Sequence, residues 1–184
     1  MDALELLLTR SSMPRLVSPG PTPEQLELML QAAARAPDHM SLQPYHFSVF
    51  SGKGVDKLAE IFAEAAAMQG MPELQQERAQ QLPKRAPMVI AVCLRYQDND
   101  KVPREEQAAS AACATLLLQQ AAFAQGLGAI WRTGWLAEDE YVAEQLGCGS
   151  DDAIIGFLYV GTPALPTPIK PSKDLSTKVS YYTD

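Results

Sequence analysis

The chain has 184 residues, of which 47% are hydrophobic and 20% are charged, a composition typical of one globular domain with its own core. A formal net charge of -7 gives no long-range attraction to nucleic acid or anionic lipid, so we expect neither as a partner. The three cysteines, Cys93, Cys113 and Cys148, lack CxxC spacing, and their odd number argues against a disulfide framework. We therefore expect a single domain over residues 1–184 in the reducing cytoplasm.

The first two predicted helices begin with recognisable start signals. MDALELLLTR starts with an acidic residue and is apolar for only a few positions, so it is unlike a signal peptide and predicts a short helix that ends near Thr9. Thr22 to Gln25 supplies an N-cap Thr, a Pro at the first helical position and a Gln at the third. This second helix is predicted to run to about Ala36, where Pro37 ends it.

The next stretch, APDHMSLQPYHFSVF at residues 36–50, holds two prolines and both histidines of the chain. Its last five residues, His46 to Phe50, alternate in polarity and predict a strand. The loop before this strand has two interpretations. It either only connects two elements, or it forms a rim of polar groups around a ligand.

The middle of the chain predicts two helices and a buried strand. Apolar residues at helical spacing from Leu58 to Ala65 mark a third helix, and residues 73–81 form a fourth that is mostly exposed. MVIAVCL, residues 88–94, is a continuous apolar run after Pro87, which is the pattern of a strand covered on both faces. Helices are therefore expected above and below one sheet.

The longest predicted helix begins at Pro103 and continues to Gln125, before Gly126 ends it. Its middle is apolar nearly all round, so we expect no solvent face, and its alanines with Ser110 allow a neighbouring backbone to approach closely. It is either the central core helix of one subunit or a helix shared across a dimer interface.

Two further strands and an arm complete the chain. GAIWRT, residues 128–133, and AIIGFLYVG, residues 153–161, predict strands, with a helix over residues 138–146 between them. From Pro163 the chain is rich in Pro, Ser, Thr and Lys and ends in VSYY. This pattern indicates a surface-crossing arm with one edge strand, and such arms often belong to a partner subunit.

No metal site or common catalytic motif is visible in the sequence. His39 and His46 lack a partner at helical or CxxC spacing, and no GxSxG elbow, P-loop or GxGxxG turn follows a predicted strand. What remains is three groups of residues at the ends of elements, each of which alone is more often structural than functional. The groups are Arg10, Ser11 and Ser12; Trp131, Arg132, Thr133 and Gly134; and Arg35, His39 and Ser41.

The order of the sequence segments is more specific to one protein family than any single motif is. Five segments, taken in order, resemble the nitroreductase family of FMN enzymes: RSS near the N-terminus, APDHMSLQPYHF, RAPMVI, the Ala-rich helix into GLGAIWRTGWL, and IIGFLYVGTP. The resemblance covers nearly the whole chain and is greatest to the compact YdjA-like branch. It implies an α+β fold with a mixed central β-sheet flanked by helices, an intertwined homodimer, and an FMN pocket built by both subunits.

The resemblance also implies roles for the three groups. A reduced flavin gathers negative charge at N1 and O2, which a nearby cation or donor stabilises, and a backbone N–H suits its N5. The phosphate and ribityl side would be held by Arg10, Ser11 and Ser12. The isoalloxazine would be lined by Trp131, Arg132, Thr133 and Gly134. The partner subunit would contribute the loop with Arg35, His39 and Ser41.

Two features depart from the family pattern. Many members have a basic residue directly after the first Arg and another further on, where this chain has Ser11 and Pro14. Arg15 or Arg35 is then the candidate for the missing cation. The family's C-terminal basic phosphate clamp is not evident either, because no motif matches Lys170, Lys173 and Lys178.

The implied function is an FMN-dependent oxidoreductase that takes hydride from NADH or NADPH and reduces a nitroaromatic, quinone or related acceptor by a ping-pong cycle. The alternative is a flavin-binding or interaction protein of the same fold without nitroreductase turnover. Nicotinamide contacts are implied at Ala121 to Gly126, but that stretch is also typical of buried core, which we favour.

Overall fold

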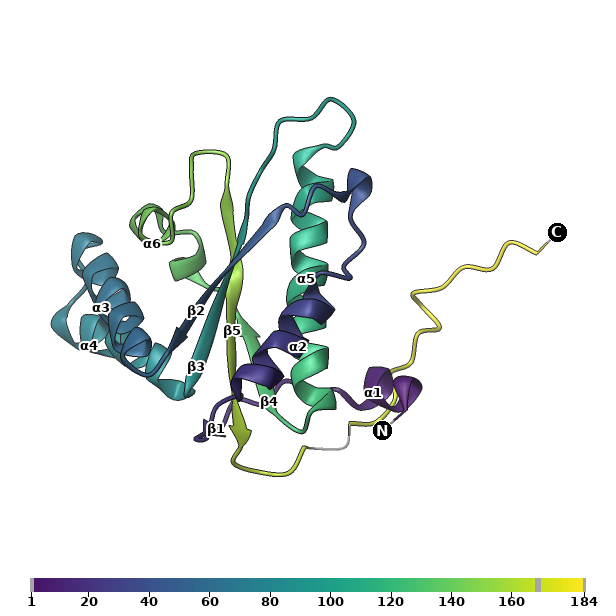
Figure 1. Cartoon of the computed structure of the whole chain (residues 1–184), viewed down its shortest axis with the longest axis horizontal. Coiled ribbons are helices and arrows are strands. Elements are labelled where there is room, and N and C mark those ends of the chain that lie inside the picture. The colour runs from purple at the N-terminus through teal and green to yellow at the C-terminus, as the bar shows by residue number, and fades with distance from the viewer. Residues whose placement is uncertain (1, 168–169, 184) are drawn as a thin grey trace.

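The computed structural model describes residues 2–167 and 170–183. Five strands form one sheet: the order along it is β1-β5-β3-β2, and β4 also pairs with β5 (Figure 1). Helices cover both faces of this sheet, as the buried strand pattern predicts. The strands are β1 (Leu16–Val17), β2 (Tyr45–Ser51), β3 (Met88–Leu94), β4 (Gly128–Arg132) and β5 (Ala153–Pro163).

The predicted helices are all present, with small shifts at their ends. In the second helix, the Gln25 N–H donates to Thr22 Oγ1 at 3.2 Å and the Thr22 N–H donates to Gln25 Oε1 at 3.0 Å, so both bonds of a capping box form. That helix ends at Ala33, earlier than predicted, because a turn already precedes Pro37. The helices are α1 (Ala3–Thr9), α2 (Pro23–Ala33), α3 (Lys53–Met68), α4 (Glu73–Gln81), α5 (Arg104–Ala124) and α6 (Glu140–Gln145), with short 3₁₀ turns at His39–Ser41, Pro83–Arg85 and Trp135–Ala137.

The described strands pair only antiparallel, so they do not form the mixed sheet that the resemblance implies. The reason is visible at the connection between β2 and β3. The hairpin of α3 and α4 returns the chain to the end of the sheet that it left, so that Ser51 lies opposite Met88 in the register. The next strand must then run in the opposite direction.

The strand β3 lies between two hydrophobic cores, one on each face of the sheet. All seven of its residues are buried, which confirms the prediction for MVIAVCL. On one face, α3 contributes Leu58 and Phe62, and Phe62 packs edge-on against Phe157 of β5 with ring centroids 5.0 Å apart. On the other face, α2 contributes Met29 and α5 contributes Leu118.

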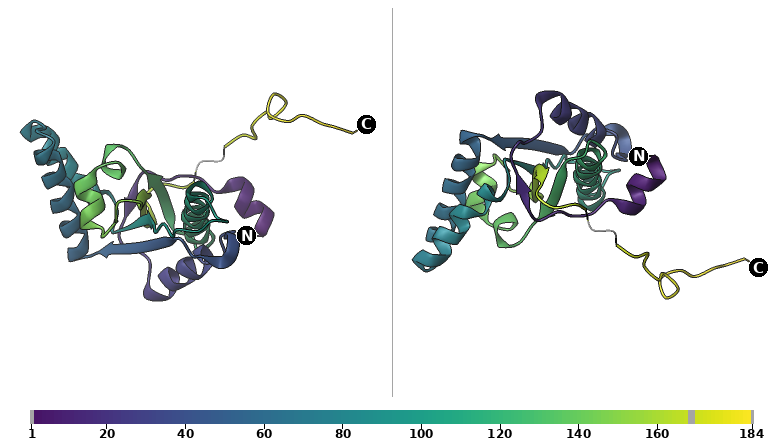
Figure 2. Two further views of the ribbon diagram at one scale, coloured as in Figure 1. Left: turned by 90° about the horizontal axis from the view of Figure 1, so that it is seen from above. Right: turned by 90° about the horizontal axis from the view of Figure 1, so that it is seen from below.

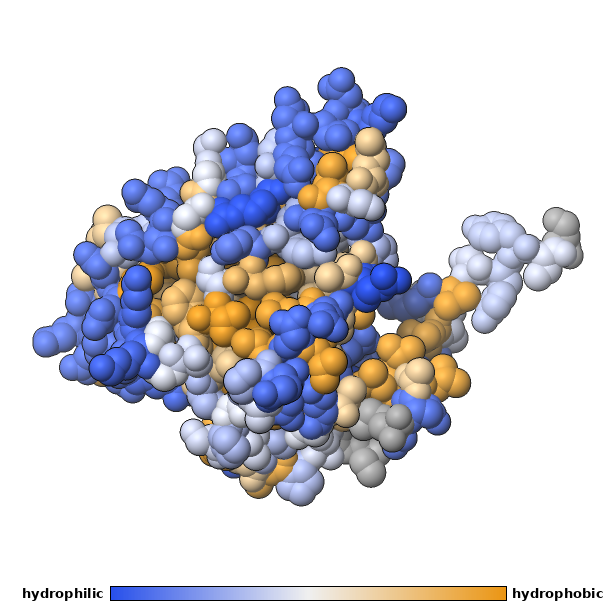
Figure 3. All heavy atoms as spheres, in the orientation of Figure 1, coloured by the Kyte–Doolittle hydropathy of each residue, from blue (hydrophilic) through white to orange (hydrophobic). Residues whose placement is uncertain are grey.

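The helix α5 has an exposed side, so the prediction of a helix without a solvent face is wrong for a single chain. The sheet and α2 pack against two of its sides, and Leu116 on the uncovered side is 39% exposed. Apolar residues are also exposed on α1, next to α5, where Leu7 and Leu8 face outward. Leu165 of the C-terminal arm is also exposed, and Figure 3 shows hydrophobic surface beside the start of this arm.

The C-terminal arm leaves the body of the protein after β5 and runs past α1 (Figures 1 and 2). The edge strand predicted for VSYY is not formed, and none of the strands in the described residues pairs with this segment. Its two tyrosines, Tyr181 and Tyr182, are among the most exposed apolar side chains. Of the helices described, none is long and apolar enough to cross a membrane.

Candidate functional site

The first predicted group follows the end of α1. Arg10 is the C-cap residue, and its N–H donates to the Leu6 carbonyl at 2.9 Å. Ser11 is only 2% exposed, and its hydroxyl has no hydrogen-bond partner among the described residues. The Ser12 hydroxyl accepts a 3.4 Å contact from Gln119 Nε2 of α5. The segment thus leads from the surface to a buried hydroxyl.

This segment runs along the free edge of β4. The Met13 N–H donates to the Ala129 carbonyl at 3.0 Å, and Gln119 Nε2 donates to the same oxygen at 3.1 Å. The Ala129 carbonyl therefore points away from β5. Because backbone groups alternate along a strand, Trp131 directs its own N–H and C=O to the same edge. The first group and the end of β4 lie side by side.

The side chains at the end of β4 point to opposite faces of the sheet. Trp131 packs on the α2 and α5 side, and its Nε1–H donates to the Ile155 carbonyl at 3.2 Å. A side chain at Gly156 would overlap the indole, so a glycine is required there. Arg132 lies on the other side, 5.8 Å from the ring centroid of Tyr159, and its Nε is buried without a partner in the described ranges.

A cavity of about 350 Å³ adjoins the end of β4 on the Arg132 side. Two guanidinium groups, those of Arg85 and Arg132, line it beside aromatic walls. Burial raises the pKa of Tyr159 to about 12 in spite of these cations, so the phenol stays neutral and does not offset their charge. The cavity is therefore positive and partly apolar; its other lining residues are Phe62, Leu82, Thr133, Gly134, Leu136, Phe157 and Tyr159.

The predicted phosphate-binding segment adjoins a second cavity of about 230 Å³. Ser12 and Arg15 line it, together with Leu165 of the arm. Arg15 is exposed, and its carbonyl accepts from the Ala164 N–H at 3.0 Å. Arg15 is thus close to the segment where a second cation was expected. Lys170, Lys173 and Lys178 are exposed on the arm.

The third predicted group lies in the loop before β2, which is held in an unusual conformation. Met40, Ser41 and Gln43 all have positive φ angles, of 61°, 55° and 50°, which side chains other than glycine rarely adopt. The loop is fixed by an internal bond from the Gln43 N–H to Asp38 Oδ2 at 2.6 Å. His39 Nδ1 lies 2.9 Å from Glu106 Oε2.

Two further bonds tie this loop to its surroundings. Ser110 Oγ donates to the Pro37 carbonyl at 2.8 Å, and Gln97 Nε2 donates to the Leu42 carbonyl at 2.6 Å. Ser110 therefore acts as a hydrogen-bond donor in addition to allowing the close approach expected of a small residue. Arg35, His39 and Ser41 remain exposed on this anchored loop.

Within one chain the third group is separated from the other two. His39 contacts Glu106 near the start of α5, whereas Ser12 contacts Gln119, which is thirteen residues later on the same helix. At 1.5 Å per residue this separation is about 20 Å. The structure brings Arg10 to Ser12 together with the end of β4, and it leaves Arg35, His39 and Ser41 at the other end of α5.

Sequence reasoning missed the glutamines that organise this region. Gln119 is 4% exposed and bonds both Ser12 and Ala129, and Gln107 is fully buried and donates to the carbonyls of Gln97 and Val102. An amide inside an otherwise apolar helix is a usable signal, because buried polar groups are nearly always hydrogen-bonded.

Only part of the segment with implied nicotinamide contacts, Ala121 to Gly126, packs as core, because Ala124 and Gly126 are exposed. Ala122 is fully buried, Phe123 packs against the cluster that includes Met13 and Leu16, and Gln125 Nε2 donates to the Gln25 carbonyl at 3.2 Å. The end of α5 therefore holds α2 in place.

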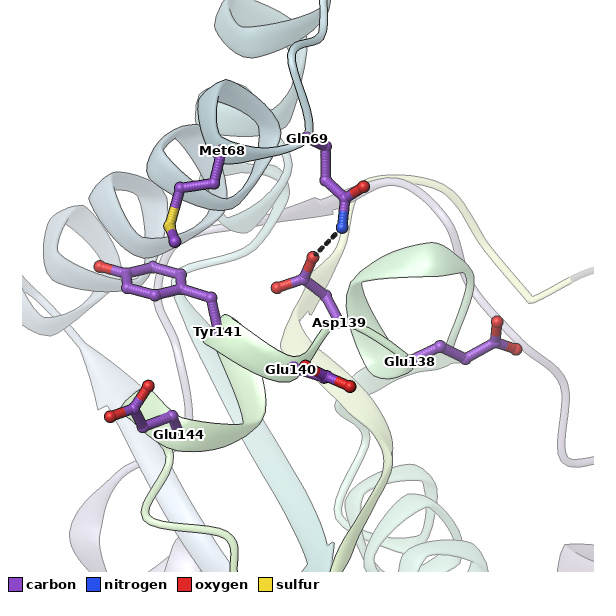
Figure 4. Close-up of a pocket in the computed structure, with 7 residues that line it drawn as sticks. All are labelled: Met68, Gln69, Glu138, Asp139, Glu140, Tyr141 and Glu144. Carbon is purple, nitrogen blue, oxygen red and sulfur yellow. Dashed lines mark hydrogen bonds between the residues drawn. The ribbon is translucent and has the colours of Figure 1, made fainter. Parts of the chain in front are cut away.

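A cavity of about 520 Å³ lies elsewhere, between the end of α3 and α6 (Figure 4). Gln69 Nε2 donates to Asp139 Oδ2 at 2.9 Å in it, and its lining is strongly acidic. An acidic lining repels a phosphate, so this cavity does not suit the ligand expected at Arg10. No cluster of His, Cys, Asp and Glu suited to a metal ion occurs among the residues with described positions.

Comparisons with known proteins agree with this fold. The model of the nitroreductase family matches residues 10–162, and the chain belongs to this family. It is 48% identical over 165 residues, 90% of either protein, to "Putative NAD(P)H nitroreductase YdjA" of Escherichia coli K12. The predictions of the family, of its YdjA-like branch and of an α+β nitroreductase fold are confirmed.

Solved structures share the fold at low sequence identity. A nitroreductase-like family protein from Bacillus cereus superposes with a TM-score of 0.86 at 21% identity, covering 100% of this chain and 97% of that one. A protein from Desulfovibrio desulfuricans described as "a putative nitroreductase in complex with fmn" gives a TM-score of 0.74 at 20% identity, covering 98% of this chain and 96% of that one.

Proposed function

We propose that this protein is an FMN-dependent oxidoreductase that takes hydride from NADH or NADPH and passes electrons to a nitroaromatic, quinone or related acceptor by a ping-pong cycle. Membership of the nitroreductase family supports the reaction class. The name of the Escherichia coli relative supports the nicotinamide, and the FMN complex of the Desulfovibrio desulfuricans structure supports the flavin.

The observation that carries the proposal is the pair of buried polar atoms without partners. In the described part of the chain these are Ser11 Oγ and Arg132 Nε. Both belong to the ten residues that the sequence assigns to FMN. Leaving a buried donor or acceptor unpaired costs about 1–3 kcal/mol, so two such atoms in one region indicate a ligand that completes them.

The residues present fit FMN. Arg10 and the hydroxyls of Ser11 and Ser12 would hold the phosphate and ribityl side, because a guanidinium and hydroxyl donors suit phosphate oxygens. The free edge of β4 at Trp131 and Thr133 would offer backbone groups to the ring system. Bound FMN supplies the hydride and electron transfer, and the protein supplies binding, orientation and charge.

The charge near the ring system follows from the arginines at the end of β4. Arg132 and Arg85 line one cavity there, and the neutral Tyr159 leaves their charge uncompensated. Cations in a partly buried place stabilise negative charge that develops on a ligand. The side chain of Arg132 would thus act from the sheet face opposite to Trp131.

The proposal includes a homodimer in which the partner subunit presents Arg35, His39 and Ser41. The exposed leucines of α1, the uncovered side of α5 at Leu116 and the arm without a strand to pair with all favour a second copy. The separation of about 20 Å along α5 also favours a contribution from another subunit rather than from the same one.

Spectra of the purified protein test the function. We expect a yellow protein with a flavin absorption that NADH or NADPH bleaches under anaerobic conditions, and that a nitroaromatic or quinone then restores. A yellow protein that neither nicotinamide reduces would favour a flavin-binding protein without turnover. A colourless protein that takes up no added FMN would refute both functions.

A further inference from the structure

Two of the three cysteines meet at one place in the structure, away from the predicted flavin site. Cys93 is fully buried on β3, next to the bulge where its register with β5 shifts. Cys148 is half-buried in the turn between α6 and β5. Cys148 packs against the hydrophobic cluster that contains Cys93, and both are free thiols. Their positions, 55 residues apart in the sequence, gave no hint of this contact.

The turn that carries Cys148 is fixed by an ion pair. The Arg95 guanidinium donates to the carbonyls of Leu146 and Gly147, directly before Cys148, and to Asp152 Oδ2 at 2.8 Å. The same Asp152 oxygen accepts from the Gly149 N–H at 2.9 Å, directly after Cys148. The backbone on both sides of the thiol is therefore held in place.

Small molecules can reach Cys148 from a cavity of about 670 Å³ that it lines. The neighbouring Cys93 thiol and the charge of Arg95 lower the pKa of Cys148 to about 7, against the opposing effects of burial and Asp152. The same contact raises the pKa of Cys93. A thiol that is accessible, partly ionised near neutral pH and next to a second thiol has the properties of oxidation-sensitive cysteines.

We propose that Cys148 and Cys93 form a peroxide-oxidisable thiol pair, in which Cys148 reacts first and Cys93 resolves it to an intramolecular disulfide. In the first step the Cys148 thiolate attacks one peroxide oxygen, an S–O bond forms and hydroxide leaves. In the second step the Cys93 sulfur attacks Cys148, the S–S bond forms and the S–O bond breaks. The two thiols lose two electrons and two protons, and peroxide is reduced to two waters.

The third cysteine provides a matched control. Cys113 on α5 is also half-buried, but no cysteine partner accompanies it among the described contacts. The proposal therefore predicts that Cys113→Ser behaves as wild type toward peroxide, whereas Cys148→Ser does not form the disulfide. Cys93→Ala keeps the reactive thiol but removes its partner, and it avoids burying a hydroxyl.

The experiment treats reduced, full-length protein with stoichiometric hydrogen peroxide, blocks the remaining thiols with N-ethylmaleimide and maps peptides by mass spectrometry. We expect wild type and Cys113→Ser to lose two free thiols and yield a peptide linked through Cys93 and Cys148. Cys93→Ala should instead accumulate a sulfenic acid at Cys148 that dimedone traps. Circular dichroism of each variant checks that it is folded.

The pH dependence of alkylation gives a second readout. The rate at which iodoacetamide modifies Cys148 should rise with the thiolate fraction, with a midpoint near pH 7, because the pKa of the thiol is lowered to about 7. The midpoint should move up in Cys93→Ala, which lacks the neighbouring thiol that lowers the pKa of Cys148. The charged groups that face Cys148 and shape this profile are Arg95 and Asp152, with Glu138, Asp139, Glu140 and Glu144 around the cavity.

Three results would overturn the proposal: all thiols surviving peroxide, Cys113 reacting as fast as Cys148, or Cys148 oxidising in wild type without a link to Cys93. These readouts count thiols and linked peptides, so they do not depend on FMN binding or on turnover. A protein that bound no flavin would not contradict the thiol-pair proposal. Thiols that did not react with peroxide would not contradict the proposed FMN-dependent function.

Discussion

Replacing Ser11 by Ala should stabilise the flavin-free protein and weaken FMN binding at the same time. Ser11 is 2% exposed and its hydroxyl lacks a partner within the described structure. Removing an unpaired buried hydroxyl removes its desolvation cost, so the free energy of unfolding should rise by about 1–3 kcal/mol. For a protein of this size, 1 kcal/mol corresponds to about 2–4 °C in Tm. Thermal unfolding of flavin-free protein, followed by circular dichroism, measures this gain.

Ser11→Ala should weaken FMN binding although it stabilises the flavin-free protein. If the Ser11 hydroxyl donates to the phosphate or ribityl side of FMN, its loss removes a hydrogen bond of about 1.5–3 kcal/mol when the acceptor is charged. The Kd for FMN should then rise about 10- to 100-fold. Quenching of flavin fluorescence on titration with protein measures this constant.

A remote serine provides the control. Ser150 is exposed, and its hydroxyl contacts only the neighbouring Asp151, at 3.4 Å. Ser150→Ala should change the free energy of unfolding by no more than about 0.5 kcal/mol and leave the Kd for FMN unchanged. A loss of stability in Ser11→Ala would show that the hydroxyl is already paired, through a water for example. An unchanged Kd would remove Ser11 from the flavin site.

The remaining predictions concern the other groups and the assembly. Arg10→Ala should raise the Kd for FMN about 10- to 100-fold with little change in unfolding, and an unchanged Kd would refute the phosphate assignment. A mixed dimer of one Arg10→Ala and one His39→Ala subunit should bind FMN normally at half of its sites; two equally impaired sites would refute the contribution from the partner. Light scattering should show a dimer, and a stable 20.0 kDa monomer at micromolar concentration would contradict it. Gly156→Ala should cost about 1–3 kcal/mol in urea unfolding because its Cβ would overlap Trp131, whereas Gly54→Ala, which has room in α3, should not destabilise.

The elements that could be predicted from the sequence are those with a distinctive local pattern of residues. Seven consecutive apolar residues after a proline are typical of a strand covered on both faces, and β3 is such a strand. Thr22 and Gln25 form the capping box that their spacing indicates. The two-residue strand β1 was missed because it has no pattern of its own, and it exists only through pairing with Thr162 and Pro163 of β5.

The candidate site was predictable in composition but not in arrangement. The alternation of β4 already indicates that Trp131 and Arg132 face opposite sides, although only the packing of Tyr159 shows what Arg132 meets there. The burial of Ser11 could not be predicted, because serine in a loop is usually exposed and its position here depends on the pairing of Met13 with Ala129. Contacts between segments far apart in the chain determine both features.

The anchored loop of residues 37–43 has a consequence for any molecule that meets it. Its three non-glycine residues with positive φ would favour other conformations if the segment were free, and side chains of α5 and the segment after β3 hold it by hydrogen bonds. The conformational entropy of this loop is therefore lost when the subunit folds, before any encounter. A ligand or second subunit that contacts His39 and Ser41 meets a rigid surface, so little of its binding free energy is lost in ordering the loop.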